Sequence, residues 1–435
     1  MNDLDKLYNK YLENNLIDNS LYKKYDVKKG LRNDDGSGVV VGLTNISDVI
    51  GYKVNEDMEK VSCEGQLIYR GLNIFDIYKD FKDGKIEKYE DICYLLLFGN
   101  LPNKEEKKIF NEYLKSRYNL PQTFIQDNIF NSPSINIMNR IQRAFLMLYR
   151  EDEDPDDSSY ISTISKGLSL LARLPAIIVY SYYSKIHTID GKDLIIHPTN
   201  KDLDIGESFL YLLKGNNYSK EEVKTLNLIL MLHADHGIGN NSTFTNLVVS
   251  STGTDIYSSF AASVGSLKGP KHGGANILSK NMMDSVIDEV GLNGSDEEIL
   301  KIIKRILNKD FFDKKGLVYG IGHAIYTKSD PRCLILKDQA KNLAKEKDRL
   351  DELNFYMRFE KIAAEYLSEK LNRERSANVD FYSGFVYDMM DIPKDLYTPL
   401  FVLSRMIGWI SHNVEEKLNS GKIIRPAGKY VGREE

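Results

Sequence analysis

The most informative stretch of this chain is HADHGIGNNSTFT, at residues 233–245. Three others share its short, glycine-rich and polar character: GPKHGGAN at 269–276, YGIGHAIYTKSDPR at 319–332 and NVDFYSG at 378–384. Together they hold four of the seven histidines, each within two residues of a glycine or a carboxylate. Glycine lets a backbone approach closely, and imidazole changes charge near neutral pH. The four segments therefore predict a site that presents histidines to a small substrate.

Length and composition bound the class of protein. A chain of 435 residues with 42% hydrophobic and 28% charged residues can bury a large core and predicts two packed domains. Its formal net charge of −5 argues against general nucleic-acid binding, which favours a basic face. Local basic groups can still bind a phosphorylated ligand.

The three cysteines, Cys63, Cys93 and Cys333, lie far apart and outside any CxxC arrangement. They suggest neither a disulfide framework nor a cysteine-based zinc site, which fits a reducing cytoplasm. Residues 1–15 are acidic and polar, unlike a signal or transit peptide, and no run of about 18 apolar residues suggests a membrane span. We therefore expect a cytoplasmic protein with no membrane segment.

Helical periodicity dominates the chain, and only residues 38–71 read as strands and turns, rich in Val, Ile and Tyr. The prediction is an all-α (mainly α) fold with a short β segment near the N-terminus. One amphipathic face is expected at Leu4, Leu7, Tyr11, Leu12 and Leu16. Three helix starts pair a capping residue with a glutamate three positions later: Asn103 with Glu106, Ser219 with Glu222, and Ser295 with Glu298.

The helix that begins after Ser219 leads into the first histidine segment. His233 continues its apolar stripe, which favours a histidine satisfied within the core. His236 follows near the helix end, beside Gly237, and is the better candidate for facing a cleft. A zinc site remains an alternative; it would need His233, His236 and a third ligand such as His272 or Asp235.

A second helix is predicted from Pro399 to about Asn419. Its first half, PLFVLSRMIGWI, is apolar apart from Ser404 and Arg405. A buried, unpaired guanidinium destabilises the folded protein by roughly several kcal/mol. Either an internal carboxylate or an anionic ligand is therefore expected to pair with Arg405. The sequence leaves both open.

Taken together and in this order, the segments resemble the si-type citrate synthase family, which includes 2-methylcitrate synthase. The resemblance runs from about Gly42 to Gly432 and extends to SRMIGWISH at 404–412 and IIRPAGKYVG at 423–432. It implies a homodimer whose subunits have two helical domains. The large domain is expected at 1–277 with 386–435 returning to it, and the small domain at 278–385.

The resemblance also implies roles for individual residues. His272 matches the histidine that hydrogen-bonds the acetyl-CoA carbonyl as it becomes an enol, and His323 matches the one that polarises the oxaloacetate ketone and protonates the alkoxide. Asp380 matches the base that removes a methyl proton. The matching oxaloacetate-binding residues are His236, Arg332, Phe401, Arg405 and Arg425, with Arg425 supplied by the partner subunit.

The chemistry explains these residue types independently. A thioester methyl is a weak acid, so a carboxylate deprotonates it only if a donor such as His272 stabilises the enolate oxygen, worth on the order of 3 kcal/mol. The two carboxylates of oxaloacetate need planar, bidentate partners, which favours arginine over lysine. For CoA, the contacts that the resemblance implies are Lys271, Gly320, Gly322 and Lys328. Thr327 stands where several relatives carry a basic residue that touches the coenzyme, and Lys328 or Lys271 is expected to substitute for it.

The expected reaction is acetyl-CoA + oxaloacetate + water → citrate + CoA, a step of the tricarboxylic acid cycle, with no metal and no redox cofactor. One alternative is 2-methylcitrate synthase, which uses propionyl-CoA; one added methyl group is worth only about 1–3 kcal/mol of discrimination. Another is a non-catalytic, ligand-sensing relative. Intact His272, His323 and Asp380 argue against it, since a binding module has no use for a base.

Overall fold

The computed structural model describes residues 10, 16–56, 59–419 and 421–432. The chain divides into two compact units, residues 44–423 and residues 1–43 with 424–435. Of the amphipathic face predicted at the N-terminus, Leu4, Leu7, Tyr11 and Leu12 lie outside the described residues.

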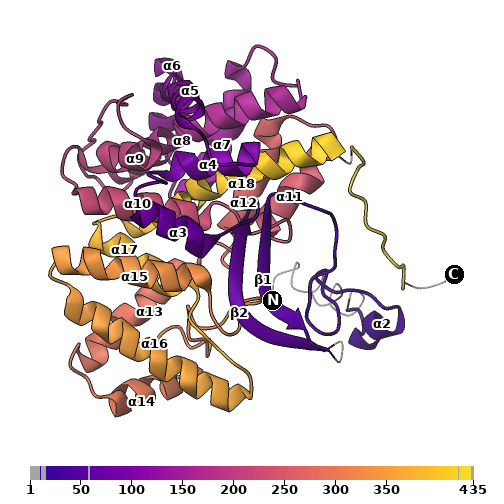
Figure 1. Cartoon of the computed structure of the whole chain (residues 1–435), viewed down its shortest axis with the longest axis vertical. Helices are drawn as coiled ribbons and strands as arrows, with labels where there is room; N and C mark the ends of the chain where they lie inside the picture. The colour runs from indigo at the N-terminus through magenta and orange to yellow at the C-terminus, as the bar shows by residue number, and fades with distance from the viewer. Residues whose placement is uncertain (1–9, 11–15, 57–58, 420, 433–435) are drawn as a thin grey trace. The chain divides into compact units, whose positions relative to one another are not determined.

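The larger unit is mainly helical, as predicted (Figure 1). Its first half contains α3 (Ile74–Lys82), α4 (Tyr89–Phe98), α5 (Lys104–Lys115), α6 (Gln122–Phe124), the π-helical turn η1 (Ile125–Phe130), α7 (Ile137–Leu148), the 3-10 turn η2 (Tyr149–Glu151), α8 (Tyr160–Thr188), α9 (Ile205–Lys214) and α10 (Lys220–His233). Its second half contains α11 (Asn241–Ser250), α12 (Ile256–Lys268), α13 (Ala275–Val290), α14 (Asp296–Leu307), α15 (Pro331–Glu346), α16 (Leu350–Leu371), α17 (Val379–Met389), the 3-10 turn η3 (Lys394–Leu396) and α18 (Tyr397–Asn419).

The predicted β segment is an antiparallel sheet in the order β1 (Ser47–Val54), β2 (Lys60–Tyr69) and β3 (Leu72–Asn73). The β1–β2 register shifts between Ile50 and Tyr52, at Gly51. A Cβ on Gly51 would stand 2.2 Å from the carbonyl oxygen of Ile325, and one on Gly65 would stand 2.2 Å from that of Ser329. The two glycines therefore let the segment 325–329 lie directly on the hairpin.

All three predicted helix starts are confirmed as reciprocal capping boxes. Asn103, Ser219 and Ser295 each accept a hydrogen bond from the backbone three residues on, and the glutamate at that position accepts one from the capping residue. The predicted C-terminal helix is also confirmed, as α18.

Two long helices, α8 and α18, form the centre of the core and pack on each other. By length and composition, α8 is apolar enough to cross a membrane, but 61% of its most apolar window is buried inside the protein. It packs against α7 and α9 as well as α18. Such burial is typical of the core helix of a globular protein.

Helices α13 to α17 pack on one another, with α15 and α13 against α17 and α14 against α16 (Figure 1). The predicted domain boundaries at 277/278 and 385/386 would separate most of these helices from the rest of the larger unit, but those boundaries stay a prediction.

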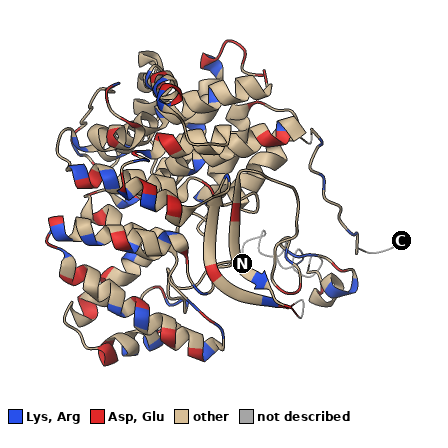
Figure 2. Cartoon of the chain, in the orientation of Figure 1, with Lys and Arg blue, Asp and Glu red and all other residues tan. Residues whose placement is uncertain are grey.

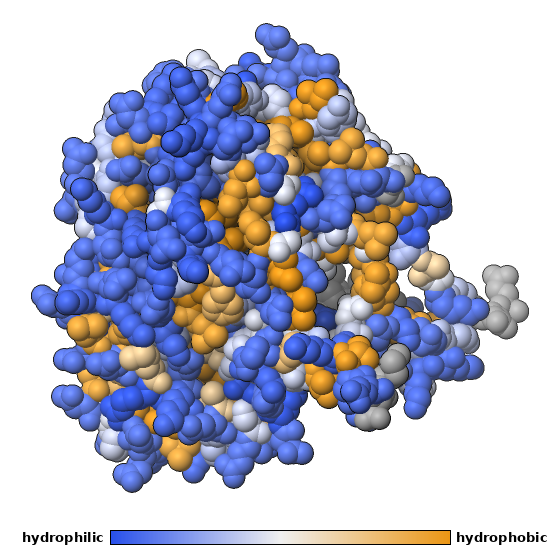
Figure 3. Space-filling model, viewed as in Figure 1, coloured by the Kyte–Doolittle hydropathy of each residue, from blue (hydrophilic) through white to orange (hydrophobic). Residues whose placement is uncertain are grey.

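Figure 2 shows Lys and Arg interspersed with Asp and Glu on the helices, in the orientation of Figure 1. Figure 3 shows the same face to be mostly hydrophilic, with smaller hydrophobic patches.

The smaller unit contains α2 (Asn19–Lys24), whose first turn is capped by Asp18. An isolated bridge joins Arg32 to Gly38. The amino group of Lys429, from the C-terminal segment, lies 5.4 Å from the ring centre of Tyr25.

Candidate active site

The turn that carries His323 fixes the protonation of its ring. Nδ1 accepts hydrogen bonds from the backbone N–H groups of Ile325, at 3.1 Å, and Tyr326, at 3.0 Å. Nδ1 therefore holds a lone pair, and the proton of the neutral ring sits on Nε2. Burial, reinforced by the nearby Arg332 cation, lowers the pKa of His323 to about 4. At neutral pH His323 is a neutral imidazole that can donate only through Nε2.

Two rings pack around this histidine. The ring of Tyr326 stacks on that of His323 at 4.9 Å, and His236 meets both edge-on, at 5.5 Å from His323 and 5.6 Å from Tyr326. Tyr326 is fully buried, and its hydroxyl donates to the carbonyl of Gln66 on β2. The β1–β2 hairpin thus fixes the Tyr326 ring, which packs against both His323 and His236.

The structure places His236 three residues beyond the end of α10, not on the helix end as the sequence suggests. Its neighbour Asp235 explains the difference, because the Asp235 carboxylate bonds Ser47, His412 and the N–H of Gly237 and draws the chain out of the helix. Gly237 takes the left-handed conformation there, with φ +76°. His236 itself has a buried Nε2 with no hydrogen-bond partner among the described residues.

Arg332 is paired with Asp330, two residues before it. Nε lies 3.0 Å from Oδ1, and Nη2 lies 2.8 Å from Oδ2, which makes the pair bidentate. Both side chains are buried, and the pair raises the pKa of Arg332 and lowers that of Asp330 against the opposing effect of burial. Nη1 lies outside this pair.

Arg405 has no such partner. It is 0% exposed, its Nε donates to the carbonyl oxygen of His233 at 2.7 Å, and Nη1 and Nη2 have no hydrogen-bond partner among the described residues. The ring of Phe401, one turn earlier on α18, lies 4.8 Å below the guanidinium and 4.8 Å from the ring of His233. Burial lowers the pKa of Arg405 to about 10, so it remains a cation at neutral pH. No carboxylate among the described residues hydrogen-bonds Arg405, and an anionic ligand for it stays a prediction.

Asp380 occupies the first turn of α17, and Asn378 links it to the His323 turn. Oδ1 of Asn378 accepts from the N–H of Asp380 at 3.0 Å, and Nδ2 donates to the carbonyl of Gly322 at 2.8 Å. An antiparallel bridge between Ile321 and Ala377 reinforces the link. Burial raises the pKa of Asp380 to about 6, against the attraction of Arg332.

His272 lies in the turn between α12 and α13. Its Nε2 lies 3.2 Å from Oδ1 of Asn240, an oxygen that also accepts from the N–H of Ser242. Nε2 is therefore the protonated nitrogen. Burial and the Arg405 cation lower the pKa of His272 to about 4, so the ring is neutral.

The two guanidinium groups connect these residues electrostatically. Arg405 acts on the pKa values of His236, His272 and Asp380, and Arg332 acts on those of His236 and Asp380 and also on that of His323. The structure thus brings seven of the predicted residues into one polar region: His236, His272, His323, Arg332, Asp380, Phe401 and Arg405.

The remaining predicted residues are not linked to this region by the contacts of the described residues. Arg425 lies in the smaller unit, where it is exposed. Lys271 is exposed, and Lys328 pairs with Glu374 at 3.7 Å. Thr327, which stands at the position expected to touch the coenzyme in relatives, is buried here, and its hydroxyl donates to Ser62.

Gly320 and Gly322 are required by the backbone. Both have positive φ, +81° and +103°, and a Cβ on Gly320 would stand 2.8 Å from the backbone of Phe381. Their predicted contact with CoA stays a prediction.

Four residues of the region were missed by the sequence reasoning: Tyr326, Asp330, Asn240 and Asn378. Two of them could have been found as helix N-caps. Asp330 comes directly before a proline at the start of α15, and Asn378 comes directly before the first residue of α17. The partners of Tyr326 and Asn240 come from segments remote in sequence, Gln66 and His272, and no local pattern indicates them.

The zinc alternative finds no support in the part of the chain that the structure describes, where no group of three or more His, Cys, Asp or Glu side chains could hold a metal ion. Asp235, one of the proposed ligands, is engaged by His412. Metal independence stays a prediction.

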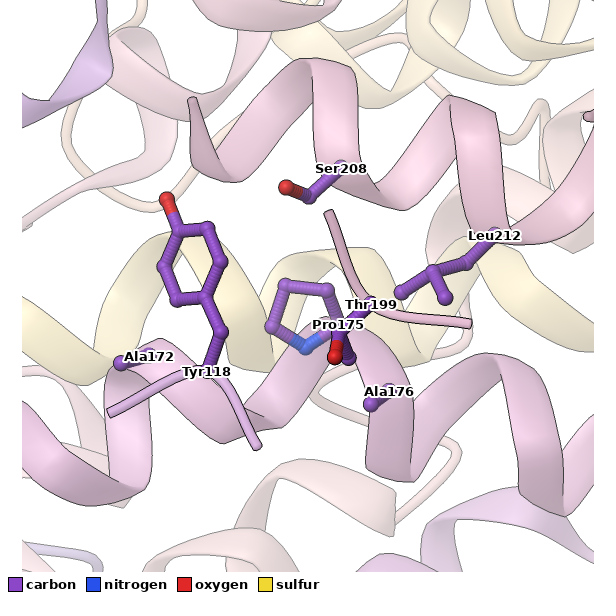
Figure 4. A pocket seen from close by; sticks show the side chains of 7 residues that line it. All are labelled: Tyr118, Ala172, Pro175, Ala176, Thr199, Ser208 and Leu212. Atoms are coloured by element: carbon purple, nitrogen blue, oxygen red, sulfur yellow. The ribbon is translucent and has the colours of Figure 1, made fainter. Parts of the chain in front are cut away.

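Two hollows lie outside this region. One, of about 10 Å³, is enclosed between α8 and α9 and is lined by Tyr118, Ala172, Pro175, Ala176, Thr199, Ser208 and Leu212 (Figure 4). It has about the volume that one water molecule needs. The other, of about 340 Å³, is an open surface groove between α3 and α15.

A family model described as the citrate synthase C-terminal domain matches residues 35–427. The chain belongs to the citrate synthase family. It is a transferase of the citrate synthase type, EC 2.3.3.

Citrate synthase 2 of Bacillus subtilis is 32% identical over 396 residues, which cover 91% of this chain and 94% of that protein. The 2-methylcitrate synthase of Shewanella oneidensis is 33% identical and covers 84% of this chain and 88% of its own. The ternary complex of carboxymethyl coenzyme A and oxaloacetate with citrate synthase from Thermoplasma acidophilum superposes with a TM-score of 0.74, at 26% identity, over 94% of this chain and 97% of that one. The mainly helical fold is therefore that of citrate synthases.

Proposed function

We propose that this member of the citrate synthase family condenses acetyl-CoA with oxaloacetate and hydrolyses the resulting citryl-CoA to citrate and CoA. The observation that carries the proposal is Arg405, a fully buried guanidinium whose Nη1 and Nη2 have no partner among the described residues. A buried charge of this kind is strongly destabilising unless something compensates it. A dicarboxylate substrate supplies that compensation.

Oxaloacetate fits the cations around Arg405. One of its carboxylates would take two parallel hydrogen bonds from Nη1 and Nη2 of Arg405, and Arg332 and His236 would receive the other through Nη1 and Nε2. Arg425 of the partner subunit would complete the clamp in a homodimer. The relative from Thermoplasma acidophilum, which binds oxaloacetate with a CoA analogue, supports oxaloacetate as the ligand.

His323 would act on the ketone of oxaloacetate. Its Nε2–H is the one proton available for donation, and the two N–H groups on Nδ1 withdraw electron density from the ring and strengthen that donor. The hydrogen bond would polarise the ketone as carbon attacks it and then deliver the proton to the developing alkoxide.

Asp380 would remove the proton from the acetyl methyl group. A pKa of about 6 leaves most of the carboxyl ionised at neutral pH and makes it a stronger base than an exposed aspartate. The Arg332 cation lies close enough to Asp380 to stabilise its ionised carboxylate.

His272 would stabilise the enol oxygen of the thioester as a neutral donor. Its Nε2–H is directed to Asn240 here, so the imidazole must turn, or its segment must move, before that proton can reach a thioester oxygen. A closing motion that also excludes water would accomplish this step and protect the thioester until citryl-CoA has formed.

The proposed reaction transfers no electrons, so it needs neither a redox cofactor nor, with these donors in place, a metal ion. We propose a cytoplasmic enzyme of central carbon metabolism in the tricarboxylic acid cycle, acting as a homodimer. An intact base at Asp380 favours catalysis over a ligand-sensing role.

Propionyl-CoA is the second candidate substrate, because a 2-methylcitrate synthase is 33% identical to this chain. Initial rates with acetyl-CoA and propionyl-CoA, each at saturating oxaloacetate and followed by thiol release, distinguish the two. Acetyl-CoA is expected to give the higher kcat/KM, and a higher value with propionyl-CoA would assign the chain to 2-methylcitrate synthesis.

A further inference from the structure

Helix α18 buries two basic side chains on one face, with the carboxylate of Asp235 between them. Arg405 and His412 lie about two helical turns apart, so they project from the same side of the helix. Arg405 and Asp235 are 0% exposed, and His412 is 1% exposed. In surroundings this dry, the partner that Asp235 chooses determines the charge left for the substrate.

Asp235 pairs with His412. Its Oδ2 accepts from Nε2 of His412 at 3.1 Å and from the N–H of Gly237 at 2.9 Å, and Ser47 donates to the same oxygen. Oε2 of Glu415 lies 3.7 Å from the other ring nitrogen of His412. An imidazole held between two carboxylates is stabilised as a cation; burial opposes this, yet Asp235 and Glu415 raise the pKa of His412 to about 9.

Gly408 brings the Asp235 carboxylate onto α18 between the two basic residues. A Cβ on Gly408 would stand 2.4 Å from Oδ1 of Asp235 and 2.6 Å from the carbonyl oxygen of Ala234. Gly408 follows Arg405 by three residues and precedes His412 by four. Oδ1 has no hydrogen-bond partner among the described residues, so one oxygen of the carboxylate is uncommitted, and the carboxylate lies close enough to Arg405 to raise its pKa against the effect of burial.

We propose that His412 is a positioning residue of the substrate site, whose ion pair with Asp235 keeps that carboxylate off Arg405 and so leaves the guanidinium free for an anionic substrate. The inference rests on the proposed function, in which Arg405 binds a carboxylate of oxaloacetate. The same pair holds the turn 235–237, from which His236 projects toward His323.

The physical reason is competition inside a low-dielectric site. A buried carboxylate without its histidine partner would turn toward the nearest free cation, and attraction between opposite charges is strong there. Arg405 would then have an internal partner that oxaloacetate must displace. Loss of His412 would therefore weaken binding of oxaloacetate although His412 itself does not touch it.

The test replaces His412 with leucine, alone and together with Asp235→Asn. His412→Leu is expected to raise the oxaloacetate KM about tenfold or more, with kcat and the acetyl-CoA KM changed by less than about threefold. In the Asp235→Asn background no carboxylate can compete for Arg405, so His412→Leu should add little to the oxaloacetate KM. His187→Gln, on an exposed histidine, is the matched control.

Equal KM increases in both backgrounds would overturn the proposal, since the effect of His412 would not pass through Asp235. A uniform loss of kcat with no change in the oxaloacetate KM would overturn it as well.

A crystal structure of the unliganded His412→Leu protein gives a readout that does not depend on activity. Asp235 is expected within about 4 Å of Arg405, the distance of an ion pair. Asp235 still turned away from Arg405 would contradict the proposal. If wild-type protein neither binds nor turns over oxaloacetate, the proposed function fails, whereas this structure still decides whether His412 keeps Asp235 from Arg405.

Discussion

Nε of Arg405 donates a 2.7 Å hydrogen bond to the carbonyl oxygen of His233, the last residue of α10. The bond ties α18 to α10 and aims the rest of the guanidinium away from the helix contact. Nη1 and Nη2 are left without partners among the described residues, although the side chain is fully buried. The ring of His233 is buried and packs on Phe401, as expected for a core residue. Both of its nitrogens lack hydrogen-bond partners among the described residues, so the satisfied histidine that the sequence favoured is not observed there.

Arg405→Leu is expected to raise the oxaloacetate KM about 10- to 100-fold, because it removes a charge-assisted contact worth about 1.5–3 kcal/mol. The acetyl-CoA KM should change little. The variant should melt at the same temperature as wild type or higher, because an uncompensated buried charge has been removed. Arg305→Leu, which breaks a surface pair with Glu289, is the control. A lower melting temperature with no selective KM effect would indicate an internal role for Arg405.

Arg332→Leu should behave differently, because Arg332 has an internal partner. It also raises the oxaloacetate KM, but it leaves the Asp330 carboxylate buried without its cation, which costs about 3–5 kcal/mol of stability. Adding Asp330→Asn should recover part of the lost stability and none of the lost affinity. Denaturant unfolding of the three proteins, combined with steady-state kinetics, measures both effects. Full recovery of affinity in the double variant would remove Arg332 from the clamp.

Asp380→Asn is expected to lower kcat by about 10²–10⁴-fold, the usual contribution of a general base, while oxaloacetate still binds. Isothermal titration and turnover measure the two separately. Near-wild-type turnover would exclude Asp380 as the base, and lost binding would point to a structural role.

The pH dependence of the same residue follows from its raised pKa. The base acts when ionised, so kcat/KM for acetyl-CoA should fall about tenfold per pH unit below an apparent pKa of about 6. The neutral form is favoured by the fold, so its stabilising contribution is present at acidic pH and is lost as pH rises through 6. The melting temperature of Asp380→Asn relative to wild type should therefore increase from pH 5 to pH 8. A difference independent of pH would show that the Asp380 pKa is not raised.

A mixed dimer tests the shared Arg425. If Arg425 serves the partner's site, homodimers of Asp380→Asn and of Arg425→Ala should both be severely impaired. Mixed dimers should regain activity, since one of their two sites combines wild-type Asp380 from one chain with wild-type Arg425 from the other. Mixed dimers shown to form but without activity would assign Arg425 to its own chain's site or to none.

The sequence was sufficient for the fold class, the capping boxes and α18, because periodicity and helix caps are local signals. It also located Arg405 as a buried charge in need of a partner. It could not decide what that partner is, because Asp235, a carboxylate that acts on the Arg405 pKa, is held by His412 and Ser47 from remote segments. For the same reason it placed His236 at a helix end, and it did not indicate that Arg332 and Asp330 form a bidentate pair.

The most direct measurement incubates the purified protein with oxaloacetate and acetyl-CoA after exhaustive chelation and quantifies citrate and free thiol together. The proposed site predicts both products in equal amounts, at a rate unchanged by chelation, and no thiol release when oxaloacetate is omitted. Absence of citrate, or activity lost on chelation and restored by zinc, would contradict it.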